Sequence, residues 1–326
     1  MTVLVTGSSG HLGEALVRTL AAARRDVIGI DLLPGPFTHQ VGSIVDRAFV
    51  RRCMPGVATV FHAATLHKPH VATHGRQDFV DTNLTGTLNL LEEAASAGVS
   101  TFVYTSTTSV FGDALTPRQH APAAWITEHV VAVPKNIYGA TKAAAEDLCQ
   151  LFARNHALRT IVLRVSRFFP EADDNPAIRD AYADANAKAN EYLHRRVDVE
   201  DVVSAHLLAA EHRPASGFAK YIISATTPFS RDEMAELREH APRVVARHVP
   251  AYAAEYARRG WRMCEGIDRV YDNARARDEL GWRPRHDFAA LVARLAGGGD
   301  IQSPLAREIG AKGYHERAFG DGPYPV

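Results

Sequence analysis

The chain has 326 residues, of which 46% are hydrophobic and 23% charged, so it can bury a large core as one domain or two closely associated ones. Its 37 basic and 37 acidic residues cancel, which argues against nucleic acid or an anionic membrane as a partner. Its three cysteines are far apart in the sequence, so we expect them to be reduced thiols and not a disulfide framework. No apolar run reaches membrane-spanning length, and we therefore expect a cytoplasmic protein.

The N-terminal segment combines a strand with a glycine-rich loop. Residues 2–6 are apolar and β-branched, as in a buried parallel strand, and no basic leader-like stretch precedes them. The loop that follows has the spacing G-x-x-G-x-x-G and consists of Gly7, Ser8, Ser9, Gly10, His11, Leu12 and Gly13. Glycines at this spacing permit a tight turn, close approach of the backbone to a pyrophosphate and tight helix-on-strand packing. The sequence therefore predicts a dinucleotide site followed by a helix that runs to residue 23.

An acidic residue ends the second predicted strand. Residues 26–30 form that strand, and Asp31 follows it. A carboxylate at this distance from the glycine loop can accept hydrogen bonds from the adenosine ribose and repels a 2′-phosphate. Two leucines come next, with no arginine to receive that phosphate. This pattern favours NAD over NADP.

The fourth predicted strand, 57–61, leads into His62, Ala63 and Ala64. Small residues after a strand let the chain pass close to a bound dinucleotide. A third, short strand is expected before it within 41–46, and Asp46 suits the N-cap of the following helix.

Four histidines near this point raise the question of a metal site; they are His62, His67, His70 and His74. No cysteine or carboxylate completes a convincing ligand set, and Pro69 and Gly75 break the segment. We therefore expect no metal, and predict instead a loop that lines the substrate site.

Residues 78–97 have the pattern of one long helix with a strongly apolar face. Asn83 and Gly86 interrupt that pattern. Either they allow close packing against the sheet, or Asn83 hydrogen-bonds a neighbouring strand, and the sequence leaves both possibilities open.

A fifth strand at 101–105 runs into a stretch rich in hydroxyl groups, 106–112, at the edge of the sheet where ligands bind. A predicted helix then carries Tyr138 and Lys142, four positions apart and so on one face. A nearby ammonium favours the phenolate and lowers the tyrosine pKa, which suits general acid–base chemistry.

These motifs together resemble the extended short-chain dehydrogenase/reductases, the NAD-dependent epimerase/dehydratase family whose best-known members act on nucleotide sugars. The resemblance covers nearly the whole chain, and the segments that carry it are 6–13, 62–64, 83–92, 102–112, 138–142, 196–202 and 280–284.

The resemblance implies an α/β fold, in which a Rossmann-like doubly wound parallel sheet is joined to a smaller C-terminal mixed α/β substrate lobe. The NAD-binding domain is expected at 1–166 plus 197–225, and the substrate lobe at 167–196 plus 226–326. Further expected elements are a strand at 159–165, one helix at 177–193, a strand and helix within 197–210, a strand at 221–224, a helix from 231, a segment at 275–282 and an extended tail at 320–326.

The same likeness implies roles for individual residues. Thr107 would be the catalytic hydroxyl, Tyr138 the acid/base and Lys142 its electrostatic partner, which also holds the nicotinamide ribose. The expected cofactor contacts are Gly7, Ser9, Gly10, His11, Leu12, Gly13, Asp31, Ser43, Ile44, His62, Ala63, Ala64, Asn83, Thr105, Tyr138, Lys142 and Arg167. The expected substrate contacts are Leu66, Thr107, Thr108, Phe168, Arg195 and Arg196.

Two departures from the family pattern bear on the substrate. The segment 168–196 is shorter than the part that holds the nucleotide in nucleotide-sugar epimerases, although Arg195 or Arg196 can bind a phosphate or carboxylate. In addition, Thr108 and Ser109 stand where the 4,6-dehydratases place an Asp-Glu pair, so we do not expect dehydratase activity.

Three functions remain in view. The first is an NAD-dependent epimerase of a sugar or sugar nucleotide. The second is a dehydrogenase or reductase of a smaller hydroxy compound such as a uronate or polyol, since uronate dehydrogenases have a short substrate part and a turn comparable to Pro170-Glu171. The third is a non-catalytic NAD-sensing scaffold, against which the intact set of Thr107, Tyr138 and Lys142 argues.

The family also implies a homodimer, formed by the helices around 83–97 and around Tyr138. Their apolar faces would pack equally well on the protein's own sheet, so the pattern alone does not decide between these arrangements.

Overall fold

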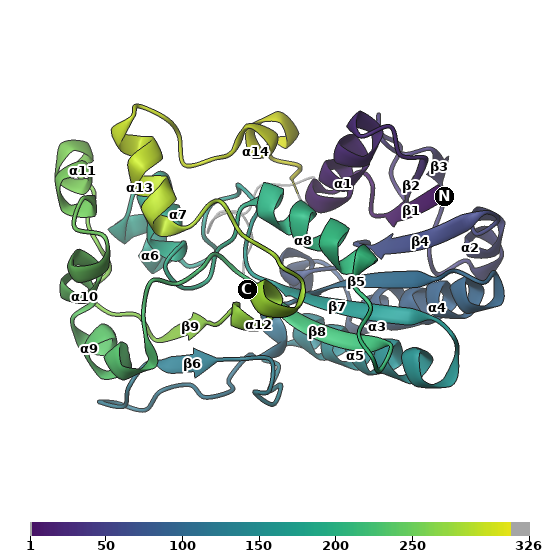
Figure 1. The fold of residues 1–326 in the computed structure, drawn as a ribbon, viewed down its shortest axis with the longest axis horizontal. Coiled ribbons are helices and arrows are strands. Elements are labelled where there is room, and N and C mark those ends of the chain that lie inside the picture. Colours follow the sequence, from purple (N-terminus) through teal and green to yellow (C-terminus); the bar gives the residue numbers. More distant parts are fainter. Residues whose placement is uncertain (1, 314–326) are drawn as a thin grey trace.

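A seven-stranded parallel sheet forms the centre of the computed structural model, which describes residues 2–313 (Figure 1). The spatial order is β3-β2-β1-β4-β5-β7-β8. β2 and β3 thus lie on one side of β1, and the chain then crosses over so that β4 pairs with β1 on the opposite side. The strands are β1 (Thr2–Thr6), β2 (Val27–Asp31), β3 (Gln40–Val41), β4 (Val57–His62), β5 (Thr101–Thr107), β7 (Arg159–Val165) and β8 (Phe218–Ile223). This arrangement confirms the predicted doubly wound α/β fold.

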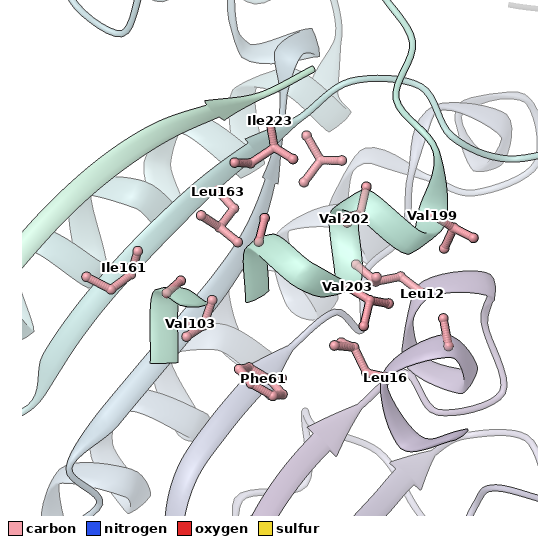
Figure 2. Close-up of a cluster of buried hydrophobic side chains, with 14 of the residues drawn as sticks. Leu12, Leu16, Phe61, Val103, Ile161, Leu163, Val199, Val202, Val203 and Ile223 are labelled. Atoms are coloured by element: carbon pink, nitrogen blue, oxygen red, sulfur yellow. The ribbon is translucent and has the colours of Figure 1, made fainter. Parts of the chain in front are cut away.

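Helices cover both faces of the sheet because its strands carry apolar residues on both sides. On one face, α1 (His11–Ala22) and α8 (Val199–Glu211) pack on the strands. Figure 2 shows Leu12 and Leu16 of α1 and Val202 of α8 in this cluster. The opposite face is covered by α2 (Arg47–Cys53), α4 (Gly86–Ser96) and α5 (Ile137–Asn155). The Asp46 side chain accepts hydrogen bonds from two backbone N–H groups of α2, as expected of an N-cap.

A second hydrophobic cluster lies under the C-terminal helices. It is accompanied by a two-stranded parallel sheet of β6 (Ala124–Ile126) and β9 (Arg269–Tyr271). The helices of this part are α6 (Pro176–Ala181), α7 (Asp184–Glu191), α9 (Met234–Glu239), α10 (Ala241–His248), α11 (Tyr252–Arg259) and α13 (Phe288–Ala296). Between them in the chain, α12 (Ala274–Glu279) packs on the central sheet through Ala276. The last helix of the described residues, α14 (Pro304–Ile309), returns to pack beside α1 and α8. Short 3-10 helices are η1 (Lys68–Ala72), η3 (Thr108–Val110) and η4 (Arg231–Glu233).

Several predicted elements differ from those observed. The third strand, expected within 41–46, is β3 at Gln40–Val41, and the helix expected from 231 begins as the 3-10 helix η4 before α9. The expected single helix 78–97 is α3 (Arg76–Val80), a π-helical turn (Asp81–Thr85) and then α4. The expected helix 177–193 is divided into α6 and α7 by Tyr182, whose backbone is extended, with φ −137° and ψ 142°. The strand expected after residue 196 is a single bridge between Arg167 and Arg196, because Asp198 already caps α8.

The expected tail 320–326 lies outside the described residues. Over 2–313, no helix combines the length and the apolar character needed to cross a membrane.

Candidate functional site

A cleft of about 610 Å³ follows the carboxyl ends of the parallel strands. Its lining includes the first residues after β1 and β4, together with the last residues of β2, β5 and β7. We call the part beside the glycine loop and Asp31 the cofactor end. The part beside η1, the loop 166–174 and Arg195 is called the substrate end. Ligands of doubly wound sheets bind at this edge because the chain order reverses there and leaves a crevice.

The glycine loop at the cofactor end brings backbone segments into close contact. Gly7 has φ +74°, and a Cβ on it would lie 2.8 Å from the backbone nitrogen of Ala64. A Cβ on Gly13 would lie 1.8 Å from the carbonyl oxygen of Gly7. The first turn of α1 follows directly at His11, so its N-terminal N–H groups face the loop. This cradle fits a pyrophosphate resting on a helix N-terminus.

Asp31 closes the cofactor end at the tip of β2. Its Oδ2 accepts a hydrogen bond of 2.9 Å from the Ser9 N–H, and its Oδ1 accepts one of 2.9 Å from the Leu33 N–H. A carboxylate offers about four lone-pair sites, so acceptor capacity remains for ribose hydroxyls. The carboxylate thus holds the glycine loop while still facing the cleft. The other predicted cofactor contacts that line the cleft are Gly7, Ser9, Gly10, His11, Leu12, Gly13, Ser43, Ile44, Ala63, Ala64, Thr105, Tyr138 and Arg167.

Tyr138 and Thr107 meet in the middle of the cleft. Tyr138 lies in the first turn of α5, which begins there because the Asn136 side chain accepts the Gly139 N–H at 3.1 Å. Thr107 ends β5, and its oxygen accepts the Ser109 N–H at 3.1 Å. Burial raises the pKa of Tyr138 to about 12, and a hydrogen bond with the Thr107 side chain opposes that rise. The two hydroxyl groups can therefore share one proton or one bound oxygen.

Lys142 lies one helical turn beyond Tyr138 but beneath the cleft surface. Its ammonium nitrogen sits 4.1 Å from the centroid of the Tyr104 ring. Burial lowers the pKa of Lys142 to about 7, although Cys149 and Glu146 act to raise it. Lys142 is therefore only partly charged near neutral pH. The expectation that it lowers the Tyr138 pKa is not met by the described residues, because burial of the phenol dominates.

His62 and Asn83, two predicted cofactor contacts, are buried behind the cleft rather than on its wall. His62 Nδ1 lies 2.8 Å from the Thr6 Oγ1, which already accepts the N–H groups of Ala63 and Ala64. The Thr6 hydroxyl must therefore donate to Nδ1, which leaves Nε2–H to donate to the Thr87 Oγ1 at 2.9 Å. A single tautomer of His62, with the proton on Nε2, therefore satisfies every hydrogen bond in this series.

The chain of hydrogen bonds continues to the catalytic helix. The Thr87 hydroxyl donates to the Asn83 carbonyl at 2.7 Å. The Asn83 side chain binds both backbone groups of Leu66 and donates to the Thr141 Oγ1 at 3.0 Å. Asn83 thus joins the loop after β4 to α5, which is neither of the two roles considered for it. Gly86 supplies close packing, since a Cβ there would lie 2.6 Å from the Ile44 side chain.

Charged side chains that pair with one another form the substrate end. Arg167 binds Asp173 at 2.6 Å and Glu191 at 3.1 Å, and Arg195 binds the same two carboxylates at 2.8 Å each. Arg196 donates to the Phe169 carbonyl and borders a smaller cavity instead of the cleft. The predicted substrate contacts that line the cleft are Leu66, Thr107, Thr108, Phe168 and Arg195.

Several residues at the cleft were not predicted. Lys68 of η1 pairs with Asp174 across the substrate end, and both line the cleft. Ser106 donates to the buried Glu146, which also pairs with Arg164 and Lys220. Lys312 lines the cleft from the C-terminal side. The partners lie far apart in the chain, so no local pattern indicates them.

The histidines that follow β4 do not converge on one point. His70 packs edge-on against His67 and His74, at centroid distances of 4.7 and 5.1 Å. Within 2–313, no group of three or more His, Cys, Asp or Glu side chains is arranged to hold a metal ion.

Comparisons with known proteins agree with this geometry. The model of the NAD dependent epimerase/dehydratase family matches residues 3–223. A UDP-glucose 4-epimerase of Streptomyces lividans is 26% identical over 329 residues, covering 89% of this chain and 93% of its own. A dTDP-glucose 4,6-dehydratase of Streptomyces antibioticus is 29% identical, covering 90% and 91%. MoeE5, solved with UDP-glucuronic acid and NAD, superposes with a TM-score of 0.66 at 24% identity, covering 94% of this chain and 99% of its own.

Proposed function

Because this chain belongs to the NAD-dependent epimerase/dehydratase family and is therefore an NAD-dependent enzyme, we propose that it transfers a hydride at a secondary hydroxyl of a sugar or sugar nucleotide, as a 4-epimerase does. The observation that carries this proposal is the contact between Tyr138 and Thr107 in one cleft with the glycine loop and Asp31. A pure binding protein needs the loop and the carboxylate, but it has no use for the hydroxyl pair.

The cofactor end supplies what a dinucleotide requires. The close approach of Gly7, Gly10 and Gly13 lets the backbone N–H groups reach a pyrophosphate, and Asp31 accepts hydrogen bonds from the adenosine ribose. When bound, NAD supplies the hydride acceptor and brings a cationic nicotinamide ring into the cleft.

Tyr138 moves the proton in the proposed reaction. Its oxygen takes the proton of the substrate hydroxyl as the carbon-bound hydride leaves, while the Thr107 hydroxyl holds the same substrate oxygen. The hydrogen bond with the Thr107 side chain favours the phenolate and opposes the rise in pKa that burial causes. In an epimerase, Tyr138 returns the proton when the hydride is delivered to the opposite face of the keto intermediate.

A second candidate is a dehydrogenase of a smaller hydroxy compound such as a uronate or polyol. It is favoured by the pairing of five of the six Lys and Arg side chains that line the cleft, since a diphosphate would have to compete with their own carboxylate partners; the sixth, Arg269, donates to the backbone carbonyls of Gly112 and Ala114. Those pairs are Lys68 with Asp174, Lys135 with Asp113, Arg167 with Asp173, Arg195 with Glu191, and Lys312 with Glu14. Elimination of water is not proposed, since Thr108 and Ser109 supply no carboxylic acid next to Thr107.

Product analysis separates the two candidates. The purified protein is mixed with NAD and with UDP-sugars, free uronates or polyols, and absorbance at the NADH wavelength is followed while sugars are separated chromatographically. Interconversion of a sugar pair without net NADH supports the epimerase. Steady accumulation of NADH with a free sugar acid would replace it by the dehydrogenase, and the absence of both activities would remove the proposed hydride transfer.

The domain boundaries 1–166 plus 197–225 and 167–196 plus 226–326, a homodimer and a cytoplasmic location complete this proposal. The dimer would pair α4 and α5 of two copies, and Leu151 on α5 supports it because its side chain is 38% exposed on that face. Leu84, Leu88 and Leu148 pack against the chain's own core, so they contribute less. Sedimentation of wild type and of Leu151→Glu tests it, with a monomeric variant expected.

A further inference from the structure

The C-terminal segment returns to the cofactor end after the chain has built the substrate lobe. α14 packs on α1 and α8 through Leu305, Ala306 and Ile309. Gly310, with φ +63°, then turns the chain, and Lys312 and Gly313 reach the wall of the cleft. This segment lies beyond the residues that the family model matches.

Acidic residues at the start of α8 fix the path of this segment. Asp198 Oδ2 accepts the Ser303 N–H at 3.2 Å, and Glu200 Oε1 accepts the Leu305 N–H at 3.2 Å. Ser303 is fully buried and caps α14 through its hydroxyl, which accepts the Ala306 N–H. The segment thus enters the cleft from a defined direction.

Three groups meet where the segment reaches the cleft. The backbone nitrogen of Lys312 lies 3.2 Å from His11 Nε2 and 3.3 Å from Glu171 Oε1, and Nε2 and Oε1 lie 3.2 Å apart. Nε2 cannot accept from Lys312 and donate to Glu171 at once. Since a carboxylate is the stronger acceptor, we assign both N–H groups as donors to Glu171. The Lys312 ammonium pairs in addition with Glu14 of α1.

The contact joins three distant parts of the chain. His11 belongs to the glycine loop, Glu171 follows β7 at the substrate end, and Lys312 comes from the C-terminal segment. The His11 and Glu171 side chains are 8% and 10% exposed, and a shielded charge-assisted contact is stronger than one in water. The contact with His11 lowers the pKa of Glu171, which keeps the carboxylate ionised.

We propose that Lys312 and Glu171 are positioning residues that hold His11, and through it the glycine loop, in the conformation that receives the dinucleotide. The proposal rests on the proposed function for the identity of that ligand. The C-terminal segment then contributes to cofactor binding. Because Glu171 belongs to the loop 166–174 at the substrate end, the position of that loop then depends on the conformation of the glycine loop.

Proline scanning tests the proposal on the full-length protein, with NAD as the probe. Lys312→Pro removes the N–H that donates to Glu171 and also the ammonium that pairs with Glu14. Lys312→Met removes the ammonium alone and so is the matched control for the N–H, and Ala311→Pro controls for the proline ring, because within 2–313 no hydrogen bond from its N–H is found. Glu171→Leu removes the shared acceptor and Glu171→Gln retains it. The dissociation constant for NAD is measured by calorimetry, alongside the thermal midpoint of each protein.

We expect Lys312→Pro and Glu171→Leu each to raise the NAD dissociation constant about tenfold, with thermal midpoints within about 3 °C of wild type. Ala311→Pro and Glu171→Gln should stay within about threefold. The double variant Lys312→Pro/Glu171→Leu should bind NAD no more weakly than Lys312→Met/Glu171→Leu, because the acceptor of the Lys312 N–H is already absent in both.

Unchanged NAD affinity in Lys312→Pro would overturn the inference, and so would weaker NAD binding by Lys312→Pro/Glu171→Leu than by Lys312→Met/Glu171→Leu. A fall in thermal midpoint without a change in NAD affinity would show that the contact only stabilises the fold. If Lys312→Pro does not fold, Glu171→Leu against Glu171→Gln decides the matter. If the wild type and all variants bind NAD equally well, this inference alone is refuted. If the wild type does not bind NAD, the proposed function is refuted as well.

Discussion

The cofactor end of the cleft is built mainly from backbone atoms, whereas the substrate end is built from side chains. At the cofactor end, backbone lies against backbone, and a Cβ on Gly13 would lie 1.8 Å from the Gly7 carbonyl oxygen. At the substrate end, the wall consists of charged side chains that pair with each other, such as Lys68 with Asp174 and Arg195 with Glu191. The cofactor end has no space for added side-chain atoms, whereas the substrate end can be rearranged because long charged side chains can exchange partners.

This difference explains how one fold keeps its cofactor while its substrates vary. Backbone contacts depend on the absence of side chains, so nearly any substitution there disturbs them. The Lys68–Asp174 pair, whose side chains are 38% and 15% exposed, contributes little to stability, so it can be rearranged at low cost. Tyr138 and Thr107 lie where the two ends meet.

The largest effect is expected for Tyr138→Phe at the meeting point of the two ends. Removing the hydroxyl leaves no group to exchange the proton with the substrate oxygen, so kcat should fall at least about a thousandfold. The ring is retained, so NAD affinity should stay within about twofold. Turnover is measured with the substrate that product analysis identifies, and binding is measured by calorimetry. An active Tyr138→Phe protein would contradict the assignment.

Gly13→Ala should produce the next largest effect, because it tests whether the cofactor end has any freedom. The added methyl group would meet the Gly7 carbonyl oxygen at 1.8 Å, and neither backbone segment can move without opening the loop. We expect NAD to bind at least about a hundredfold more weakly. Gly297→Ala is the control, since its added Cβ meets its nearest atom at 3.5 Å. NAD affinity within threefold of wild type in Gly13→Ala would remove the contrast.

Local sequence patterns predicted most of the cofactor end, because its determinants lie within a few residues of each other. The glycine spacing and Asp31 are such short-range signals, whereas the doubly wound sheet was implied by the family resemblance. Lys68 and Asp174 are 106 positions apart, and only the folded chain brings them together. The same holds for Lys312 and Glu171.

The position of His62 in its strand also carries information about where its side chain lies. Side chains alternate along a strand, and Val60 packs on the face that α4 and α5 cover. Because His62 lies two positions later, its side chain points to that face and away from the cleft. Alternation therefore predicts a buried imidazole, and the expected cofactor contact falls to Ala63 and Ala64. The hydrogen-bond partners Thr6 and Thr87 still require the fold.

Thr87→Val should have an intermediate effect, because it breaks the buried chain that joins the glycine-loop strand to the catalytic helix. The substitution keeps the shape but leaves His62 Nε2–H and the Asn83 carbonyl without their partner. We expect the free energy of unfolding to fall by about 2 kcal/mol. Thr87→Ser, which keeps the hydroxyl, should lose less than about 1 kcal/mol. Urea denaturation measures both, and equal stabilities would show that the chain does not couple these elements.

The smallest effect on stability is expected for Lys68→Met at the substrate end. The Lys68 side chain is 38% exposed, so loss of its pair with Asp174 should change the free energy of unfolding by less than about 1 kcal/mol. Its effect on the substrate should be larger, because the Asp174 carboxylate is then left uncompensated at the cleft and repels an anionic ligand. KM for an anionic substrate should rise about fivefold while kcat is unchanged. Arg275 on α12 is 35% exposed, close to Lys68, and does not line the cleft, so Arg275→Met, which breaks its pair with Glu279, should leave KM unaltered. If Lys68→Met destabilises the protein as strongly as Thr87→Val does, then the substrate end is as rigid as the cofactor end and the contrast between them fails.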